Sequence, residues 1–257
     1  MIESELLFTQ VLGCDRVSLY LNKEKHLTIG QSRRISSSLE RRIMGEPLQY
    51  ILGKTEFMGL GFKVNKNVLI PRPETELLVE AAIKYSKGKK ILDLGTGSGC
   101  IAVSLAKKSI GTDITAVDIS KAALDTAKEN ARLNGVKVRF LCTELFKGLS
   151  NKFDLIISNP PYVPSLQIES LQPELKYEPL IALDGGVDGL DFYRKIIKDA
   201  PNYLNDKGIL IMEIGFNQRK DIEKIIGGVK CFNIIEVTKD YNKIDRVIVV
   251  EKGRRNG

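Results

Sequence analysis

From residue 89 onward, the chain alternates short apolar runs with helical stretches. The apolar runs are Ile91–Leu94, Ile114–Val117, Val138–Leu141, Leu155–Ile157 and Ile209–Met212. Between them lie stretches with helical character, such as 101–108, 121–133 and 192–204. Parallel strands need crossover connections, which are usually helices, and those helices bury both faces of the sheet. The alternation therefore predicts an α/β fold with a parallel sheet between two layers of helices.

The last part of the chain predicts a different strand pairing. Two strand-like runs, 231–237 and 246–250, are separated by little more than Lys239–Lys243. This link is too short for a parallel crossover, so we expect these two strands to be antiparallel. A parallel sheet closed by an antiparallel hairpin differs from the dinucleotide-binding Rossmann pattern.

The amino-terminal 52 residues have the spacing of short helices. Apolar residues recur at roughly helical intervals before Gly13, which is expected to end the first helix. Ser37 and Glu40 form a capping-box pattern that predicts a helix over Leu39–Met44. A helical unit of this size is marginally stable alone, so we expect it to dock on the larger domain or on a partner.

Two further segments stand out between and after these regions. Residues 55–57 and 62–64 are expected to form a hairpin around Gly59–Gly61. Residues 163–188 contain prolines and glycines and have little periodicity. A loop of that length within a domain is usually a lid or a binding element.

Bulk properties exclude several classes of protein. The 257 residues are 43% hydrophobic and 28% charged, which is typical of a globular protein. The net charge of +7 arises from basic residues interleaved with acidic ones, so we expect no sequence-specific binding to nucleic acid. No signal peptide or membrane-spanning run is visible, and the single histidine, His26, forms no metal-ligand spacing with the scattered cysteines. We expect a cytoplasmic monomer with no metal site and no membrane contact.

The run Ile91–Leu94 leads into a glycine-rich turn that opens a helix. Glycines tolerate positive φ and let a ligand approach the backbone, and the helix start offers free N–H groups. A dinucleotide fingerprint needs a glycine in the sixth place of this turn, where Cys100 stands instead. The turn resembles the cofactor loop of S-adenosylmethionine-dependent methyltransferases. The candidate contacts to S-adenosyl-L-methionine are Gly95, Thr96, Gly97, Ser98 and Gly99.

Acidic residues follow the next two strands. Asp118 lies 23 residues after Gly95 and could accept hydrogen bonds from both ribose hydroxyls. It could instead cap a helix, although Ser120 is better placed for that role. Glu144 could accept a hydrogen bond from the adenine amine, with Leu145 as an apolar cover. Glu144 could equally be a solvated surface residue.

The tetrapeptide Asn159–Tyr162, Asn-Pro-Pro-Tyr, directly follows the apolar run that ends at Ser158. Two prolines end a strand and stiffen the loop, because they lack backbone donors and fix φ. The loop presents an amide, backbone carbonyls and an aromatic ring at the carboxyl end of a strand, where ligands bind in open α/β sheets. These groups can hold a planar NH2 group. The alternative is a structural Pro-Pro turn with a packed tyrosine.

Taken together, these motifs resemble the peptide chain release factor glutamine N5-methyltransferases, the HemK or PrmC family. The resemblance covers nearly the whole chain. The motifs that carry it are Gly45–Tyr50, Ile70–Glu76, Gly95–Gly99, Asn159–Tyr162, and Glu178-Pro179 followed by Ala182–Gly186. Asn-Pro-Pro-Tyr alone also resembles DNA methyltransferases that act on adenine or cytosine amino groups.

The resemblance implies a fold, an activity and a partner. It implies an amino-terminal helical substrate-binding domain (1–53), a β-hairpin linker (54–72) and a seven-stranded, Rossmann-like class I S-adenosylmethionine-dependent methyltransferase domain (73–257). The activity implied is methylation of the glutamine N5 in the Gly-Gly-Gln motif of class 1 release factors, with S-adenosyl-L-homocysteine as product. Methylation of a ribosomal protein glutamine or of DNA adenine N6 remains an alternative.

The same tetrapeptide predicts the chemistry. We expect the Asn159 side-chain oxygen and the Pro160 carbonyl to accept the two amide hydrogens of the substrate. Pro161 is a further candidate substrate contact, and Asn159 is also a candidate contact to S-adenosyl-L-methionine. Tyr162 is expected to pack against the amide plane, which makes Asn159, Pro160 and Tyr162 the candidate catalytic residues. Arg72 lies between Pro71 and Pro73, and Glu74 follows Pro73. The family resemblance implies that both contact the substrate at the mouth of the site; alternatively, both belong to a structural linker.

Overall fold

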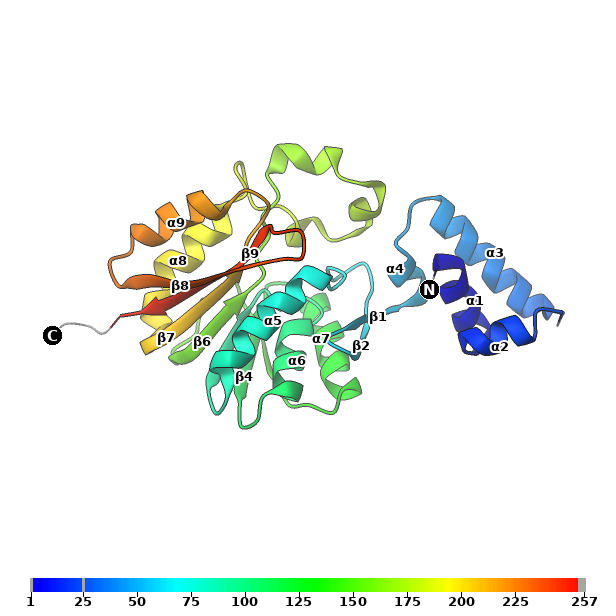
Figure 1. Ribbon diagram of the computed structural model, residues 1–257, viewed down its shortest axis with the longest axis horizontal. Helices are drawn as coiled ribbons and strands as arrows, with labels where there is room; N and C mark the ends of the chain where they lie inside the picture. Colours follow the sequence, from blue (N-terminus) through cyan, green and yellow to red (C-terminus); the bar gives the residue numbers. More distant parts are fainter. Residues whose placement is uncertain (1, 25, 254–257) are drawn as a thin grey trace.

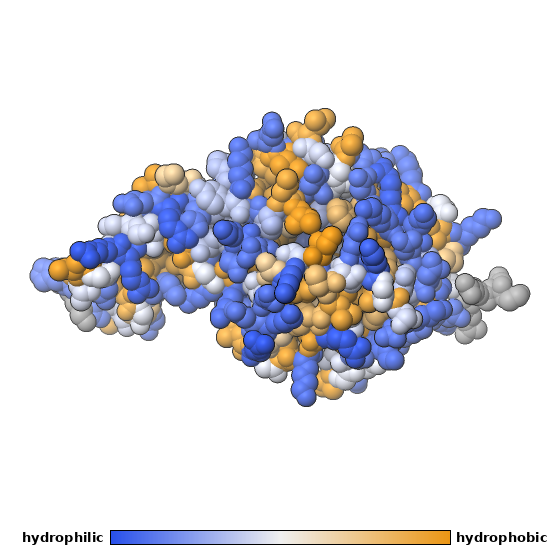
Figure 2. Space-filling view, turned by 180° about the vertical axis from the view of Figure 1, so that it is seen from behind, coloured by the Kyte–Doolittle hydropathy of each residue, from blue (hydrophilic) through white to orange (hydrophobic). Residues whose placement is uncertain are grey.

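The amino-terminal helices form a small lobe beside a larger sheet-containing lobe (Figure 1). The computed structural model describes residues 2–24 and 26–253. Within these residues the small lobe contains the following helices: α1 (Glu3–Leu12), α2 (Arg16–Leu21), α3 (Ile29–Ile43) and α4 (Leu48–Leu52). Its core is a cluster of four buried side chains, namely Leu7, Val11, Ile35 and Leu48. Seen from the opposite side, the small lobe projects from the larger one (Figure 2).

Two helix boundaries in the small lobe test the sequence expectations. Helix α1 ends at Gly13, whose φ of 65° is left-handed, as expected. Helix α3 begins much earlier than expected, because its capping box is formed by Thr28 and Gln31 rather than by Ser37 and Glu40. The expected helix start at Leu39 was therefore wrong, and Ser37 lies inside a continuous helix.

A hairpin connects the two lobes and packs on the larger one. Strands β1 (Lys54–Phe57) and β2 (Leu60–Lys63) pair antiparallel. Their turn is Met58-Gly59, both with positive φ, and not the expected Gly59–Gly61. Two residues with positive φ match the tight turns that suit the twist of a hairpin.

The larger lobe is built on a seven-stranded sheet. Its strands in chain order are β3 (Lys90–Leu94), β4 (Asp113–Asp118), β5 (Arg139–Cys142), β6 (Phe153–Ser158), β7 (Leu204–Glu213), β8 (Phe232–Lys239) and β9 (Asp245–Lys252). The spatial order is β5-β4-β3-β6-β7-β9-β8. Strands β3 to β7 are parallel, whereas β9 is antiparallel to both β7 and β8, so the expected antiparallel final pair is confirmed.

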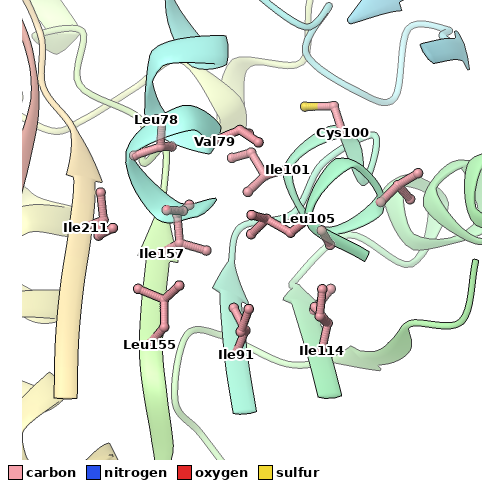
Figure 3. Packing of buried hydrophobic residues seen from close by; sticks show 14 of the residues in the cluster. Leu78, Val79, Ile91, Cys100, Ile101, Leu105, Ile114, Leu155, Ile157 and Ile211 are labelled. Carbon is pink, nitrogen blue, oxygen red and sulfur yellow. The ribbon is translucent and has the colours of Figure 1, made fainter. Parts of the chain in front are cut away.

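Helices cover both faces of this sheet, as the strand pattern predicts. One face carries α5 (Pro73–Ser86), α6 (Cys100–Lys108) and α7 (Lys121–Leu133), and the other carries α8 (Asp191–Tyr203) and α9 (Arg219–Gly227). Alternate residues of a strand point to opposite faces. Ile91 therefore packs beneath α5 and α6, whereas Leu92 joins the cluster under α8 and α9. Figure 3 shows α5 and α6 side chains, among them Leu78 and Leu105, directed toward the strands.

The segment 163–188, here called the long loop, contains three short 3-10 helices. These are Ser165–Ser170, Pro173–Tyr177 and Leu180–Ala182. The loop runs above the sheet toward α3 and α4 (Figure 1). Within residues 2–24 and 26–253, no helix is long and apolar enough to cross a membrane.

Candidate active site

The carboxyl ends of β3, β4 and β6 meet around a cavity of about 150 Å³. Strands β4 and β5 lie on one side of β3, whereas the chain continues with β6 on its other side, so the strand order reverses between β3 and β6. Open α/β sheets bind ligands at such a point. The lining includes eight of the residues predicted from sequence: Gly95, Gly97, Asp118, Glu144, Leu145, Asn159, Pro160 and Pro161. No lysine, arginine or histidine lines this cavity among the residues described.

The glycine loop is shaped by contacts beneath it. Gly95, Gly97 and Gly99 all have positive φ, between 54° and 81°. A Cβ on Gly99 would lie 3.0 Å from the Cβ of Ala127 in α7, so the loop and that helix approach as closely as a glycine permits. Thr96 is buried and donates to the Asp93 carboxylate at 2.6 Å.

Not every loop residue faces the cavity. Thr96, Ser98 and Gly99 do not line it, and Ser98 is buried, with its carbonyl accepting from Asn130 at 2.9 Å. Asn130 also bonds the backbone N–H and carbonyl of Lys63 in β2, so it joins the glycine loop to the hairpin. The cofactor contacts assigned to Thr96, Ser98 and Gly99 remain predictions, and their observed role is to shape the loop.

Asp118 braces the glycine loop from the end of β4. One carboxylate oxygen accepts from the Gly97 N–H at 2.8 Å, and the other accepts from the Ser120 N–H at 2.8 Å. Burial raises the pKa of Asp118, although these backbone donors act in the opposite direction. Ser120 caps α7 by accepting from the Ala123 N–H, so the cap belongs to Ser120. Each Asp118 oxygen keeps a lone pair with which to accept from a ligand hydroxyl.

The segment after β5 provides one exposed acid and one apolar wall. Glu144 is exposed and lies 3.6 Å from the Lys195 ammonium, yet it borders the cavity. Leu145 has a φ of 45° and also lines the cavity. Phe146 instead turns into the core and stacks on Tyr203 with ring centroids 4.6 Å apart.

Asn159 is held by two buried residues that the sequence did not suggest. Its side-chain NH2 donates to the Thr75 hydroxyl at 3.1 Å, and Thr75 donates to Glu213 at 2.7 Å. Within the described residues, neither the Asn159 side-chain oxygen nor the Pro160 carbonyl accepts a hydrogen bond. Both oxygens are therefore available to a substrate.

Tyr162 lies behind this loop and does not line the cavity. It is half-buried and packs beside the cluster under α8 and α9, and burial raises the pKa of its phenol to about 12. Its carbonyl accepts from Gln218 at 2.9 Å. Gly185 lies against it from the long loop, where an added Cβ would come within 2.8 Å of the Tyr162 Cα. The predicted packing of Tyr162 on the substrate amide stays a prediction.

Arg72 and Glu74 do not line the cavity. Arg72 donates to both carboxylate oxygens of Glu178 at 2.7 Å, which joins the start of α5 to the long loop. Glu178 is buried, and burial raises its pKa, although Arg72 acts in the opposite direction. Glu74 is half-buried in the first turn of α5.

The long loop also contacts the small lobe. The Tyr177 hydroxyl donates to the Met44 carbonyl at 2.9 Å, and Arg42 of α3 pairs with Glu174 at 3.1 Å. A Cβ on Gly45 would lie 3.4 Å from Pro173. The loop that follows Tyr162 is thus attached to the end of α3.

Comparison with known proteins decides the family. Residues 1–53 match the PrmC N-terminal domain, and residues 73–172 match the methyltransferase small domain. A release factor glutamine methyltransferase of Thermodesulfovibrio yellowstonii is 45% identical over 98% of this chain and 92% of its own length. A protein of the same name from Geobacter sulfurreducens is 45% identical over 96% of this chain and 88% of its own length. The chain belongs to the release factor glutamine methyltransferase family.

The resemblance stated from the motifs is therefore confirmed, and the chain is a methyltransferase. Solved structures agree on the fold. A methyltransferase from Pyrococcus furiosus has a TM-score of 0.60 at 18% identity and covers 88% of this chain and 100% of its own. A ribosomal protein L11 methylase from Lactobacillus delbrueckii has a TM-score of 0.57 at 22% identity, over 74% of this chain and 84% of its own. The expected seven-stranded class I methyltransferase fold is confirmed.

Proposed function

We propose that this chain methylates the side-chain amide nitrogen (N5) of the glutamine in the Gly-Gly-Gln motif of class 1 peptide chain release factors. One observation carries the proposal: the Asn159 NH2 group is engaged by Thr75, so the Asn159 oxygen and the Pro160 carbonyl remain as acceptors beside the cavity. Two neighbouring acceptors match the two hydrogens of a carboxamide NH2 group. The relatives, named release factor glutamine methyltransferases, favour a protein glutamine over a nucleobase.

The methyl donor in this proposal is S-adenosyl-L-methionine, and the product is S-adenosyl-L-homocysteine. The residues present fit this cofactor, because Asp118 has spare acceptor positions for ribose hydroxyls and Leu145 offers an apolar wall beside Glu144. S-adenosyl-L-methionine supplies a methyl group made electrophilic by a positively charged sulfur. Among the described residues, no basic side chain lines the cavity, so none would repel the positive charge on that sulfur.

The contribution of the chain to the reaction is to position the acceptor nitrogen. A carboxamide nitrogen is a weak nucleophile because its lone pair is delocalised into the carbonyl. Hydrogen bonds to Asn159 and Pro160 orient the NH2 group and increase the electron density on nitrogen. Correct placement of two reactants can lower a barrier by several kcal/mol. One amide proton is lost, and water is its acceptor in this scheme.

The same proposal assigns a role to each part of the chain. Residues 1–53 hold the release factor, 54–72 link the lobes, and 73–257 carry the catalytic site. Arg72 and Glu74 remain candidate substrate contacts, with Arg72 also fixing the long loop through Glu178.

The test is mass spectrometry after incubation with S-adenosyl-L-methionine. The substrates are a class 1 release factor, the same factor with the motif glutamine replaced by alanine, ribosomal proteins and adenine-containing DNA, each supplied separately. We expect one added methyl group on the Gly-Gly-Gln peptide and none in the other three reactions. An unmodified release factor beside methylated ribosomal protein or DNA would overturn the proposal.

A further inference from the structure

Behind the Asn159 side chain lies a buried pair that does not line the cavity. Glu213 ends β7 and is 1% exposed, and Thr75 is the third residue of α5 and is 2% exposed. Thr75 donates to Glu213 at 2.7 Å and accepts from the Asn159 NH2 group at 3.1 Å. The three side chains form a relay from the core of the sheet to the edge of the cavity.

The chemistry of the relay fixes its direction. A hydroxyl group has one hydrogen to donate, whereas a carboxylate that has lost its proton, as Glu213 has above about pH 7, can only accept. Because Thr75 gives its hydrogen to Glu213, it can act only as an acceptor toward Asn159. Thr75 alone could donate to the Asn159 oxygen just as well as accept from the nitrogen. Glu213 therefore determines which way the asparagine amide points.

We propose that Thr75 and Glu213 are positioning residues that hold the Asn159 amide with its oxygen toward the methyl acceptor. This inference rests on the proposed function, in which that oxygen accepts a hydrogen from the substrate amide. If the Asn159 amide turned over, its NH2 group would face the NH2 group of the substrate, and two donors would oppose each other. The relay prevents that orientation.

The cost of burying Glu213 supports a specific role for it. An ionisable group in a protein core is unfavourable unless it is well paired, and an apolar residue of similar volume often serves stability better. The surrounding charges are mixed, since Arg246 of β9 attracts the Glu213 carboxylate and Glu74 of α5 repels it. The Thr75 hydroxyl bonds both Glu213 and Asn159, and the Asn159 side chain also lowers the Glu213 pKa by hydrogen bonding, so the buried acid is linked to the site.

The test uses the full-length chain, a class 1 release factor and radiolabelled S-adenosyl-L-methionine at pH 8, where Glu213, with a pKa raised to about 7, is mostly ionised. Thr75→Val keeps the shape of the side chain and removes the hydroxyl. We expect kcat to fall about 10- to 100-fold, because small misplacements of reacting groups have effects of that size. The dissociation constant of the cofactor, measured by calorimetry, should stay unchanged, and Thr75→Ser, which restores the hydroxyl, should recover most of kcat.

Two controls separate positioning from general destabilisation. Thr115→Val makes the same change at a buried position of β4 away from the cavity, and it should leave kcat unchanged. In an Asn159→Ala background, Thr75→Val should cause no further loss, because its effect acts through Asn159. If Thr75→Val does not fold, Thr75→Ala takes its place.

Each outcome bears on a different conclusion. If the unaltered chain methylates release factor and the Thr75→Val variant has the same kcat, this inference is overturned and the proposed function stands. An equal fractional loss in the Asn159→Ala background would also overturn it. No methylation of release factor by the unaltered chain would overturn the proposed function and, with it, this inference.

Discussion

Glu213→Gln should make the chain more stable at alkaline pH relative to the unaltered protein. Burial raises the pKa of Glu213 from 4.5 to about 7, against the opposing effects of the Thr75 hydroxyl and Arg246. The folded state therefore holds this proton at pH values where the unfolded state has already lost it. Stability falls as pH rises through this range, because the folded state binds more protons than the unfolded state.

The size of the effect follows from the shift. Each pKa unit corresponds to about 1.4 kcal/mol, so a shift of this size removes about 3 kcal/mol of unfolding free energy between roughly pH 4.5 and pH 7. Asp93 has a pKa that burial likewise raises to about 7, so the unaltered protein loses stability from both groups. Comparison with Glu213→Gln isolates the contribution of Glu213.

Urea unfolding followed by circular dichroism measures this difference, since the chain has no tryptophan to report by fluorescence. The free energy of unfolding of Glu213→Gln minus that of the unaltered chain should increase by about 3 kcal/mol from about pH 4.5 to pH 8. Glu80→Gln, at an exposed position of α5, is the matched control and should show no such trend. A difference that stays constant with pH for Glu213→Gln would refute the reasoning.

Three further changes test the site. Asn159→Ala should lower kcat about 100- to 1,000-fold while calorimetry shows retained cofactor binding, and wild-type turnover would contradict the role of its amide. Asp118→Ala should weaken cofactor affinity about 10- to 100-fold by calorimetry, since it removes hydrogen bonds to a charged acceptor, and an unchanged affinity would exclude it from the cofactor site. Gly185→Ala should cost about 1–3 kcal/mol of unfolding free energy, because its Cβ would meet the backbone of Pro161 and Tyr162 at 2.8 Å. Gly227→Ala, where a Cβ meets open space, is its control in thermal melts, and equal effects of the two would disprove the packing argument.

Most of the sheet could be predicted from sequence because its strands are short apolar runs bounded by turn residues. Ile91–Leu94 ends at a glycine loop and Phe153–Ser158 ends at two prolines, so their limits are visible locally. Helix α3 was harder to predict, since Thr28–Gln31 and Ser37–Glu40 both carry a capping-box pattern. Only the first opens the helix, and local sequence does not distinguish them.

In the site, too, residues placed by a nearby sequence signal could be predicted, whereas contacts between distant parts of the chain could not. Gly95, Asp118 and Asn159 each follow an expected strand, so the parallel topology alone brings them to one edge. Thr75 and Glu213 could not be predicted, because their hydrogen bond joins residues 138 positions apart. In the sequence, Glu213 resembles any acidic residue at a strand end, and only the fold reveals that it is buried.

The attachment of the long loop to α3 has a consequence for how a protein substrate can be handled. Tyr177 and Glu174 bond the loop to Met44 and Arg42, and the loop directly follows the Asn-Pro-Pro-Tyr segment, residues 159–162. In the proposed function, a protein bound to the small lobe would therefore contact the lobe to which one end of the long loop is bonded, while the other end of that loop joins the candidate active site. If binding to the small lobe orders the long loop, binding at the candidate active site no longer has to order it. By linkage, the affinities at the two places are then coupled. In the proposed function, recognition of the protein substrate and placement of its amide would then both depend on the backbone of the long loop.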